Sequence, residues 1–412
     1  ENGGAAFVLL YIGFVIIIGI PYMFAELALG RHSHKNPIGA VAAIRPKGGW
    51  KLIGVLGVIT GVGILSFYGV IAGWTVGYIF NMASGQAIDF GSFISNDIMV
   101  LLLFAFFMLL TTSIVYGGIE GGIERWTKIL MPILLFLLIG LIVYSNTLEG
   151  SNEGLAFYLK PDLSKITGST VLAALGQAFF SLSLGMGLMI TYGSYITKKD
   201  NLVSSALYVG LFDTMIAIMS GLIIFPALFA MGQNPSAGPE LIFVVFPKLF
   251  LEMPGGIVVG TIFFILLSVA ALTSTISLLE VPTAYLVDEK KVSRKKVVWL
   301  VAGFVYIVGI PSALSQGSSE FFTNFGLVPK FLADKDFLSQ MSFIFGEFSL
   351  SFGALLTSIF VGWVWKAHNA SEEIMIGAPN FQKTRKLWEF FVKFFIPIVI
   401  FVILLSLFGI FE

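Results

Sequence analysis

Long apolar runs separated by short polar segments make up almost the whole chain. A helix that crosses a bilayer needs about 20 mostly apolar residues, and many runs here reach or exceed that length. The longer runs predict helices that tilt or protrude beyond the hydrocarbon. We therefore expect an all-α polytopic membrane protein. The predicted spans lie near residues 5–29, 52–83, 97–116, 127–146, 169–197, 201–231, 255–287, 297–314, 337–366 and 388–410.

One of these runs is interrupted by small and polar residues. Residues 176–187 read Gly-Gln-Ala-Phe-Phe-Ser-Leu-Ser-Leu-Gly-Met-Gly. Each Gly costs a helix about 1 kcal/mol relative to Ala, and Ser hydroxyls can replace lost backbone hydrogen bonds. Because irregular backbone in a membrane is tolerated only where it is buried in protein or lines a cavity, the pattern predicts a discontinuous helix around 180–186 at a binding site. A Gly/Ser kink that only permits close helix packing is the alternative.

Composition narrows the class of protein. The 412 residues are 57% hydrophobic and only 12% charged, with a mean hydropathy of +0.93, whereas soluble domains carry about 25% charge. The chain has no Cys, three His and zero net charge. These features exclude disulfides, argue against a metalloenzyme or haem protein, and give no basic face for nucleic acid. No catalytic motif is found, so we expect no enzyme.

Basic residues are concentrated in alternate loops, namely 31–51, 198–200, 288–296 and 366–387. The positive-inside rule places these loops in the cytoplasm of a multi-pass protein of the cell membrane. The first predicted span then begins outside the cell without a signal peptide, which predicts a further helix upstream. The longer segments 232–254 and 315–336 predict an external turn with a short helix and a lid, respectively, or else plain connectors.

A carboxylate stands inside the predicted span 201–231. Asp213 costs roughly 2.5–3.5 kcal/mol there on insertion scales, and such residues usually mark ion or proton paths. A surface Asp at the end of a shorter helix is the alternative. Glu26 and Glu280 also lie near or within spans, and we assign neither a binding role.

Several motifs, taken together in this order and spacing, resemble the neurotransmitter:sodium symporter family. They are Glu-Asn-Gly-Gly at 1–4, Gly-Ile-Pro-Tyr-Met-Phe-Ala-Glu-Leu-Ala-Leu-Gly-Arg at 19–31, Gly-Trp-Thr-Val-Gly at 73–77, Gly-Ile-Glu-Arg at 122–125, the 176–187 motif, Leu-Thr-Ser-Thr at 272–275 and Val-Ser-Arg-Lys-Lys at 292–296.

This resemblance implies a five-plus-five inverted-repeat transporter fold. Residues 1–146 would be the remainder of the first repeat, 169–366 the second repeat, and 388–410 an additional C-terminal helix. The family's first helix precedes the Glu-Asn-Gly-Gly motif, so the resemblance implies that this helix is missing from the chain.

The family's function is sodium-coupled import of amino acids by alternating access. By resemblance, the substrate would contact Ile64, Tyr68, Phe180, Ser181, Ser183, Met186, Ser274 and Leu278. The apolar members favour a hydrophobic or aromatic amino acid. Sodium would be bound by Ser181, Asp213, Ala270, Thr273 and Ser274, because Na⁺ is a hard cation that prefers oxygen. Back-bonding of the hydroxyls to their own helix is the alternative at 273 and 274.

Asp213 would also supply the charge that chloride provides in some relatives, which removes a chloride requirement. Tyr195 and Asp288 would form an inner gate, and Asp336 an outer gate. The implied partners are an amino acid, Na⁺, the lipid bilayer and a possible second copy in a homodimer, with no cofactor and no metal other than Na⁺. An ion channel, or a non-transporting or compromised fragment that binds amino acid, are the alternatives.

Overall fold

The computed structural model describes residues 3–86, 88–232, 241–325 and 335–410, and every regular element within them is a helix. Nine helices of this described part are long and apolar enough to cross a membrane. They are Ala5–Ser33, Lys51–Ala83, Asp97–Tyr116, Ile119–Asn146, Leu202–Ala230, Gly256–Lys290, Arg294–Leu314, Phe337–Val364 and Arg385–Ser406. Each coincides with a predicted span, so the all-α polytopic class is confirmed.

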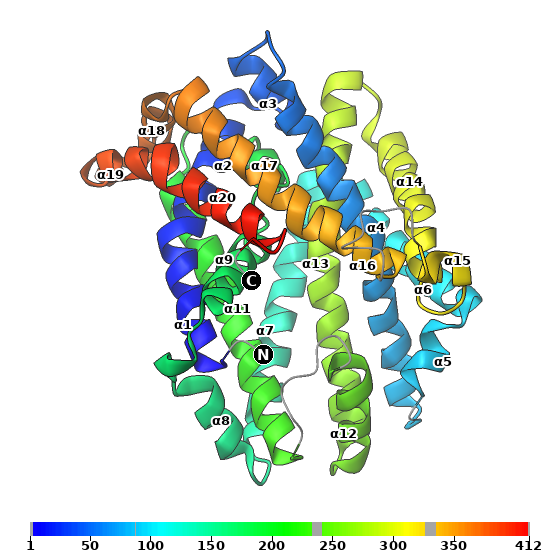
Figure 1. Ribbon diagram of the computed structural model, residues 1–412. Coiled ribbons are helices and arrows are strands. Elements are labelled where there is room, and N and C mark those ends of the chain that lie inside the picture. Colours follow the sequence, from blue (N-terminus) through cyan, green and yellow to red (C-terminus); the bar gives the residue numbers. More distant parts are fainter. Residues whose placement is uncertain (1–2, 87, 233–240, 326–334, 411–412) are drawn as a thin grey trace.

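Several spans combine α-helical and π-helical turns. The label η marks π-helical turns, except for η3 and η8, which are 3₁₀ helices; the α-helices are labelled in Figure 1. The elements before the break are α1 (Ala5–Phe14), η1 (Val15–Gly19), α2 (Ile20–Ser33), α3 (Pro37–Ile44), α4 (Lys51–Ala83), α5 (Phe90–Ile94), α6 (Asp97–Tyr116), η2 (Ile119–Glu124), α7 (Arg125–Asn146), α8 (Ser151–Leu159), η3 (Leu163–Lys165) and α9 (Gly168–Ser181). Those after it are α10 (Leu188–Gly193), α11 (Leu202–Ala230), η4 (Leu241–Val245), α12 (Phe246–Glu252), α13 (Gly256–Lys290), α14 (Arg294–Leu314), α15 (Glu320–Thr323), α16 (Phe337–Met341), η6 (Ser342–Ser349), α17 (Leu350–Ile359), η7 (Phe360–Val364), α18 (Ala367–Met375), η8 (Pro379–Lys383), α19 (Arg385–Phe390), η9 (Phe391–Phe395) and α20 (Ile396–Ser406).

The two long helices α4 and α13 pack side by side and form the frame of the bundle (Figure 1). A glycine of α4 also brings α6 against this pair, because a Cβ on Gly73 would lie 2.9 Å from the backbone of α6. Small residues drive helix association in lipid, where apolar side chains alone give no preference for protein over acyl chains. The frame therefore depends on backbone proximity along α4.

Pairs of hydroxyl groups also join neighbouring helices. Thr75 of α4 lies 2.6 Å from Ser268 of α13, between their Oγ atoms. The Oγ1 atoms of Thr111 in α6 and Thr275 in α13 are 2.8 Å apart. Such interhelical bonds contribute about 0.6 kcal/mol on average in a membrane, so they fix register more than they add stability.

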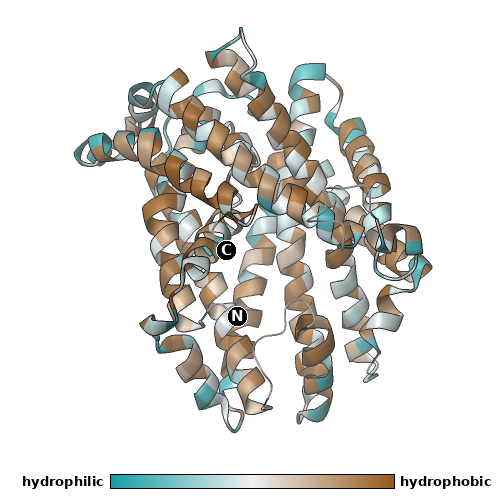
Figure 2. Cartoon of the chain, in the orientation of Figure 1, coloured by the Kyte–Doolittle hydropathy of each residue, from teal (hydrophilic) through white to brown (hydrophobic). Residues whose placement is uncertain are grey.

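Hydrophobic residues make up most of the length of the helices, and hydrophilic residues are concentrated at the helix ends and loops (Figure 2). Large side chains such as Phe136 and Ile307 are 73% and 65% exposed. Contiguous apolar surface of this kind is rare on soluble monomers. The lateral surface is therefore the one that faces lipid.

The two ends of the bundle differ. The predicted basic loops lie at the end that carries α3 and α18, and α5, α8 and α12 lie at the opposite end (Figure 1). The predicted short helix in 232–254 is present as η4 and α12, while 233–240 lie outside the described residues. The predicted lid, 315–336, includes α15, and its residues 326–334 also lie outside them.

Candidate functional site

The predicted span 169–197 is broken. α9 ends at Ser181 and α10 begins at Leu188, so the discontinuous helix expected around 180–186 is present. Three residues of the connecting segment have a positive φ: Ser183 (54°), Gly185 (83°) and Gly187 (74°). The left-handed conformation costs a non-glycine residue roughly 1–2 kcal/mol. At Ser183 this strain is retained, which is typical of functional sites.

Backbone packing holds the break in place. A Cβ on Gly185 would lie 2.3 Å from the carbonyl oxygen of Leu350 in α17. A Cβ on Gly57 of α4 would lie 3.2 Å from the backbone of Met186. Met186 itself is buried. The unwound segment therefore lies between α4 and α17, against backbone on both sides.

A buried carboxylate stabilises the unwound backbone. Glu26 of α2 is fully buried, and its Oε1 accepts hydrogen bonds from the Gly185 N–H at 3.1 Å and from the Tyr22 hydroxyl at 3.2 Å. Its Oε2 has no hydrogen-bond partner in the part of the chain that the structure describes. Sequence reasoning noted Glu26 but gave it no role, because nothing in the sequence places residue 26 beside residue 185.

Asp213 of α11 lies beside the end of α9. Its Oδ2 accepts a hydrogen bond from the Ser181 hydroxyl at 2.5 Å and another from the Tyr11 hydroxyl at 3.1 Å. The Tyr11 and Ser181 oxygens are 3.0 Å apart. α1 and α9 thus bring two hydroxyl oxygens together around one carboxylate of α11. Among the described ion pairs, none includes Asp213, and the carboxylate is held by hydrogen bonds from the Ser181 and Tyr11 hydroxyls.

Tyr11 was not predicted as a site residue, and no signal in the sequence singles it out. Gln177, four residues before Ser181 in α9, is exposed. Phe180 is 41% exposed, and a Cβ on Gly346 would lie 3.8 Å from its ring. Phe180 therefore lies between the end of α9 and η6.

The remaining predicted pocket residues lie where α4 faces α13. The Tyr68 side chain of α4 interacts with the Ser274 side chain of α13. Ile64 and Leu278 are buried on the same two helices. The i, i+4 spacing places Ile64 and Tyr68 on one face of α4.

Two of the predicted sodium ligands are adjacent in α13. The Thr273 hydroxyl donates to the Ala270 carbonyl oxygen at 2.7 Å. This is the back-bonding of the alternative interpretation. The same hydrogen bond holds the Thr273 hydroxyl oxygen next to the Ala270 carbonyl oxygen. Ser274, the next residue, is exposed. Carbonyl and hydroxyl oxygens are ligands that hard cations accept, so the donor set fits Na⁺.

The predicted inner-gate residues have different partners. The Tyr195 hydroxyl donates to Glu280 Oε1 at 2.6 Å, and Glu280 forms a two-bond ion pair with Arg294. Asp288 instead accepts from the backbone and side-chain amides of Asn36, at 3.2 and 3.3 Å. Tyr195 and Asp288 therefore belong to two neighbouring contacts, and Glu280 and Arg294 are polar residues that sequence reasoning left unassigned.

The predicted outer-gate residue Asp336 caps α16. Its Oδ1 accepts from the Ser339 N–H at 3.0 Å and from Gln316 Nε2 at 2.8 Å. An N-cap carboxylate stabilises a helix by about 1 kcal/mol. The cap fixes Asp336 where η6 and α16 enter the bundle.

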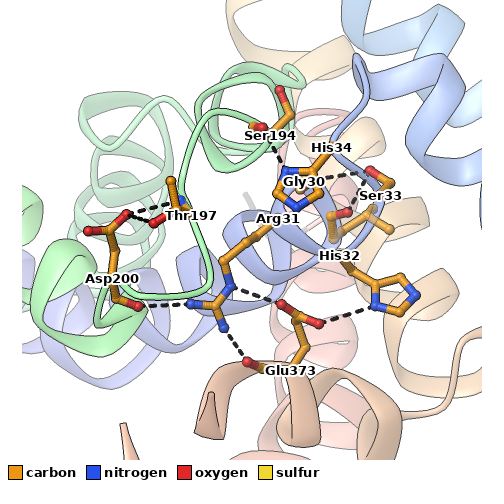
Figure 3. A network of polar contacts seen from close by, with 10 residues as sticks. Gly30, Arg31, His32, Ser33, His34, Ser194, Thr197, Asp200 and Glu373 are labelled. Carbon is orange, nitrogen blue, oxygen red and sulfur yellow. Dashed lines mark hydrogen bonds and ion pairs between the residues drawn. The ribbon is translucent and has the colours of Figure 1, made fainter. Parts of the chain in front are cut away.

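A second buried network closes the basic end of the bundle (Figure 3). Arg31 of α2 is fully buried; its Nε donates to Glu373 Oε1 of α18 at 2.9 Å, and its Nη1 to the Asp200 carbonyl at 3.1 Å. Hydrogen bonds from the Thr197 hydroxyl and N–H hold the pKa of the Asp200 carboxyl below its usual range. Arg31 thereby joins three segments that are distant in the sequence.

A bundle of spanning helices, with one helix broken over a carboxylate and hydroxyl groups, is the arrangement of a secondary transporter. The family model described as the sodium:neurotransmitter symporter family matches residues 1–88 and 84–411. The chain belongs to this family and is a sodium-coupled, multi-pass membrane transporter.

Individual relatives agree. Uncharacterized sodium-dependent transporters of Haemophilus influenzae and Bacillus subtilis (YhdH) are each 36% identical; the alignments cover 98% and 99% of this chain and 91% of each relative. The crystal structure of MhsT in complex with L-phenylalanine is similar with a TM-score of 0.88 and 42% identity, over 99% of this chain and 92% of that one. The transporter fold expected from the resemblance is confirmed.

Proposed function

We propose that this transporter imports amino acids with hydrophobic or aromatic side chains, by symport with Na⁺ and alternating access. The observation that carries the proposal is the contact between Ser181, at the end of the broken helix, and Asp213. A carboxylate inside a membrane span that takes part in none of the described ion pairs is suited to a cation. The L-phenylalanine complex of MhsT supports the substrate class.

The substrate would lie along the unwound segment 182–187. The Tyr68 hydroxyl would bind the carboxylate of the substrate. Tyr68 lies on the face of α4 that is turned towards Ser274 of α13. Ile64, Met186 and Leu278 would surround its side chain, with Ser183 beside it; the first three are buried and apolar. An apolar pocket discriminates by burial of side-chain surface, about 25 cal/mol per Å², which favours large hydrophobic substrates.

Two sodium ions would occupy the two oxygen clusters. One would be held by Ser181 and Asp213, and the other by the Ala270 carbonyl, Thr273 and Ser274. The first cluster joins α9 to α11, so Na⁺ bound there would favour one arrangement of these helices over the other. The membrane potential adds about 2.3 kcal/mol per charge per 100 mV to inward movement.

Gating would use residues at both ends of this path. Phe180 would close over the substrate from outside, with Asp336 held nearby by its helix cap. Tyr195 and Asp288 would close the cytoplasmic side through Glu280 and Asn36. We place the basic end in the cytoplasm, and assign 1–146 and 169–366 to the two inverted repeats, with 388–410 as an additional helix.

Competition for uptake tests the substrate class. In proteoliposomes with an inward Na⁺ gradient, excess Phe, Trp or Leu should inhibit uptake of labelled Phe, and excess Gly should not. Removal of the Na⁺ gradient should abolish accumulation. Inhibition by Gly alone would refute the apolar pocket, and non-saturable flux that is independent of Na⁺ would indicate a channel.

Thr273→Val should weaken sodium activation without loss of folding. The substitution keeps the shape of the side chain and removes one hydroxyl, which is worth about 1–2 kcal/mol, or roughly 5- to 30-fold in the Na⁺ concentration for half-maximal uptake. Thr261→Val is the matched control, because Thr261 forms the same back-bond in α13, to Ile257 at 2.7 Å. An equal shift in both variants would show that the effect comes from the helix and not from an ion.

A further inference from the structure

A groove of about 520 Å³ lies on the lateral surface, where the basic end of α14 meets the end of α6. It is lined by Tyr116, Lys295, Lys296, Trp299 and Leu300, all of which are exposed. None of these residues belongs to the transport path described above. The groove therefore needs a separate explanation.

The charge of the groove is positive and uncompensated. Arg294, the preceding residue, is engaged by Glu280, but neither lysine takes part in an ion pair within the described ranges. Lys295 Nζ lies 5.4 Å from the centre of the Tyr116 ring, and it makes a cation–π contact there. Because both lysines are in the first turn of α14, they oppose its dipole and do not stabilise the helix. They are free to bind an anion.

The wall of the groove is apolar and continues along the helix. Leu300, Phe304 and Ile307 recur at three- and four-residue spacing on α14, and all three are exposed to more than half of their surface (65%, 58% and 65%). Gly303 lies on the same side, and a Cβ there would meet nothing within 4 Å. A shallow apolar track thus runs from the lysines towards the centre of the lateral surface.

We propose that this groove binds one anionic phospholipid of the leaflet at the basic end of the bundle. The phosphate lies against Lys295 and Lys296, Tyr116 and Trp299 lie at the level of the headgroup, and an acyl chain follows the track past Gly303. Basic pockets between spanning helices on the cytoplasmic side are suited to such headgroups. The apolar track distinguishes a lipid from a free phosphate ion, which would gain nothing from it.

Lipid binding to the detergent-solubilised full-length protein, measured by native mass spectrometry, tests the proposal. Phosphatidylglycerol should bind at least about tenfold more tightly than phosphatidylcholine with the same acyl chains. Lys295→Gln with Lys296→Gln should abolish this preference. The matched control is Lys198→Gln with Lys199→Gln, a pair of exposed lysines in another basic loop, which should keep it.

Gly303→Leu tests the track without a change of charge. The added side chain enters open space, so the variant should fold and bind phosphatidylglycerol less tightly. Inorganic phosphate at the same concentration should not raise the melting temperature as the lipid does. The proposal would be overturned by equal affinity for the two lipids, or by the same preference for phosphatidylglycerol in both double-lysine variants. Unchanged binding to the Gly303 variant, or equal stabilisation by phosphate, would overturn it as well.

Discussion

Asp213→Asn should make uptake dependent on chloride. In the proposed mechanism the Asp213 carboxylate supplies the negative charge beside the first sodium ion, and the amide cannot. We expect uptake by the variant to fall roughly 5- to 150-fold in chloride-free medium, the range of a coupling free energy of about 1–3 kcal/mol. Millimolar chloride should restore part of it, since Ser181 and Tyr11 would then donate to the ion. Initial rates of substrate uptake, with gluconate in place of chloride, measure both effects.

Asp97→Asn provides the control for this experiment. Asp97 is exposed in the first turn of α6, so its loss should leave uptake and chloride independence unchanged. Loss of uptake by the unmodified protein in chloride-free medium would refute the role of Asp213. An Asp213→Asn variant that transports at the original rate without chloride would do the same.

Gly185→Ala should destabilise the protein and abolish transport. The left-handed φ of 83° costs an alanine roughly 1–2 kcal/mol. Its Cβ would lie 2.3 Å from the Leu350 carbonyl and 2.9 Å from the Ala354 side chain, and such overpacking adds about 1–3 kcal/mol. Displacement of the segment also weakens the bond between the Gly185 N–H and Glu26. Thermal unfolding in detergent and uptake in proteoliposomes check the two effects.

Gly176→Ala separates local strain from the general effect of a methyl group. Gly176 lies inside α9, where a Cβ meets nothing within 4 Å, and alanine favours a helix by about 1 kcal/mol. The control should therefore melt at the same or a higher temperature. A Gly185→Ala protein that is as stable and active as Gly176→Ala would contradict a requirement for the strained break.

The sequence was sufficient for features that depend on local composition. Apolar length identified the spans, and Gly and Ser within 176–187 identified the break, because both signals act within one helix. Asp213 was recognised as unusual from its position in a span. Its contact with Ser181 joins residues 32 positions apart, and its placement came from the family resemblance.

Contacts between distant segments were not predictable in the same way. Tyr11 meets Asp213 across 202 positions, and Glu26 meets Gly185 across 159. Tyr and Gly are common in membrane helices, and none of the four residues indicates its partner in the sequence. The resemblance implied that Tyr195 and Asp288 form the inner gate, but it did not indicate their hydrogen-bond partners, which are Glu280 for Tyr195 and Asn36 for Asp288. Only the relative placement of the helices decides such pairings.

The contact between α2 and α10 has a mechanical consequence. A Cβ on Gly30 would lie 2.0 Å from the Ile190 carbonyl oxygen, and one on Gly193 would lie 2.5 Å from that of Leu27. With main chain touching main chain, no side chain is present whose rotamer could change to let the two segments slide. We therefore expect α10, the inner half of the broken helix, to move with α2 as one rigid body. A tilt of α10 would then displace Arg31, and through its ion pair with Glu373 it would also displace α18.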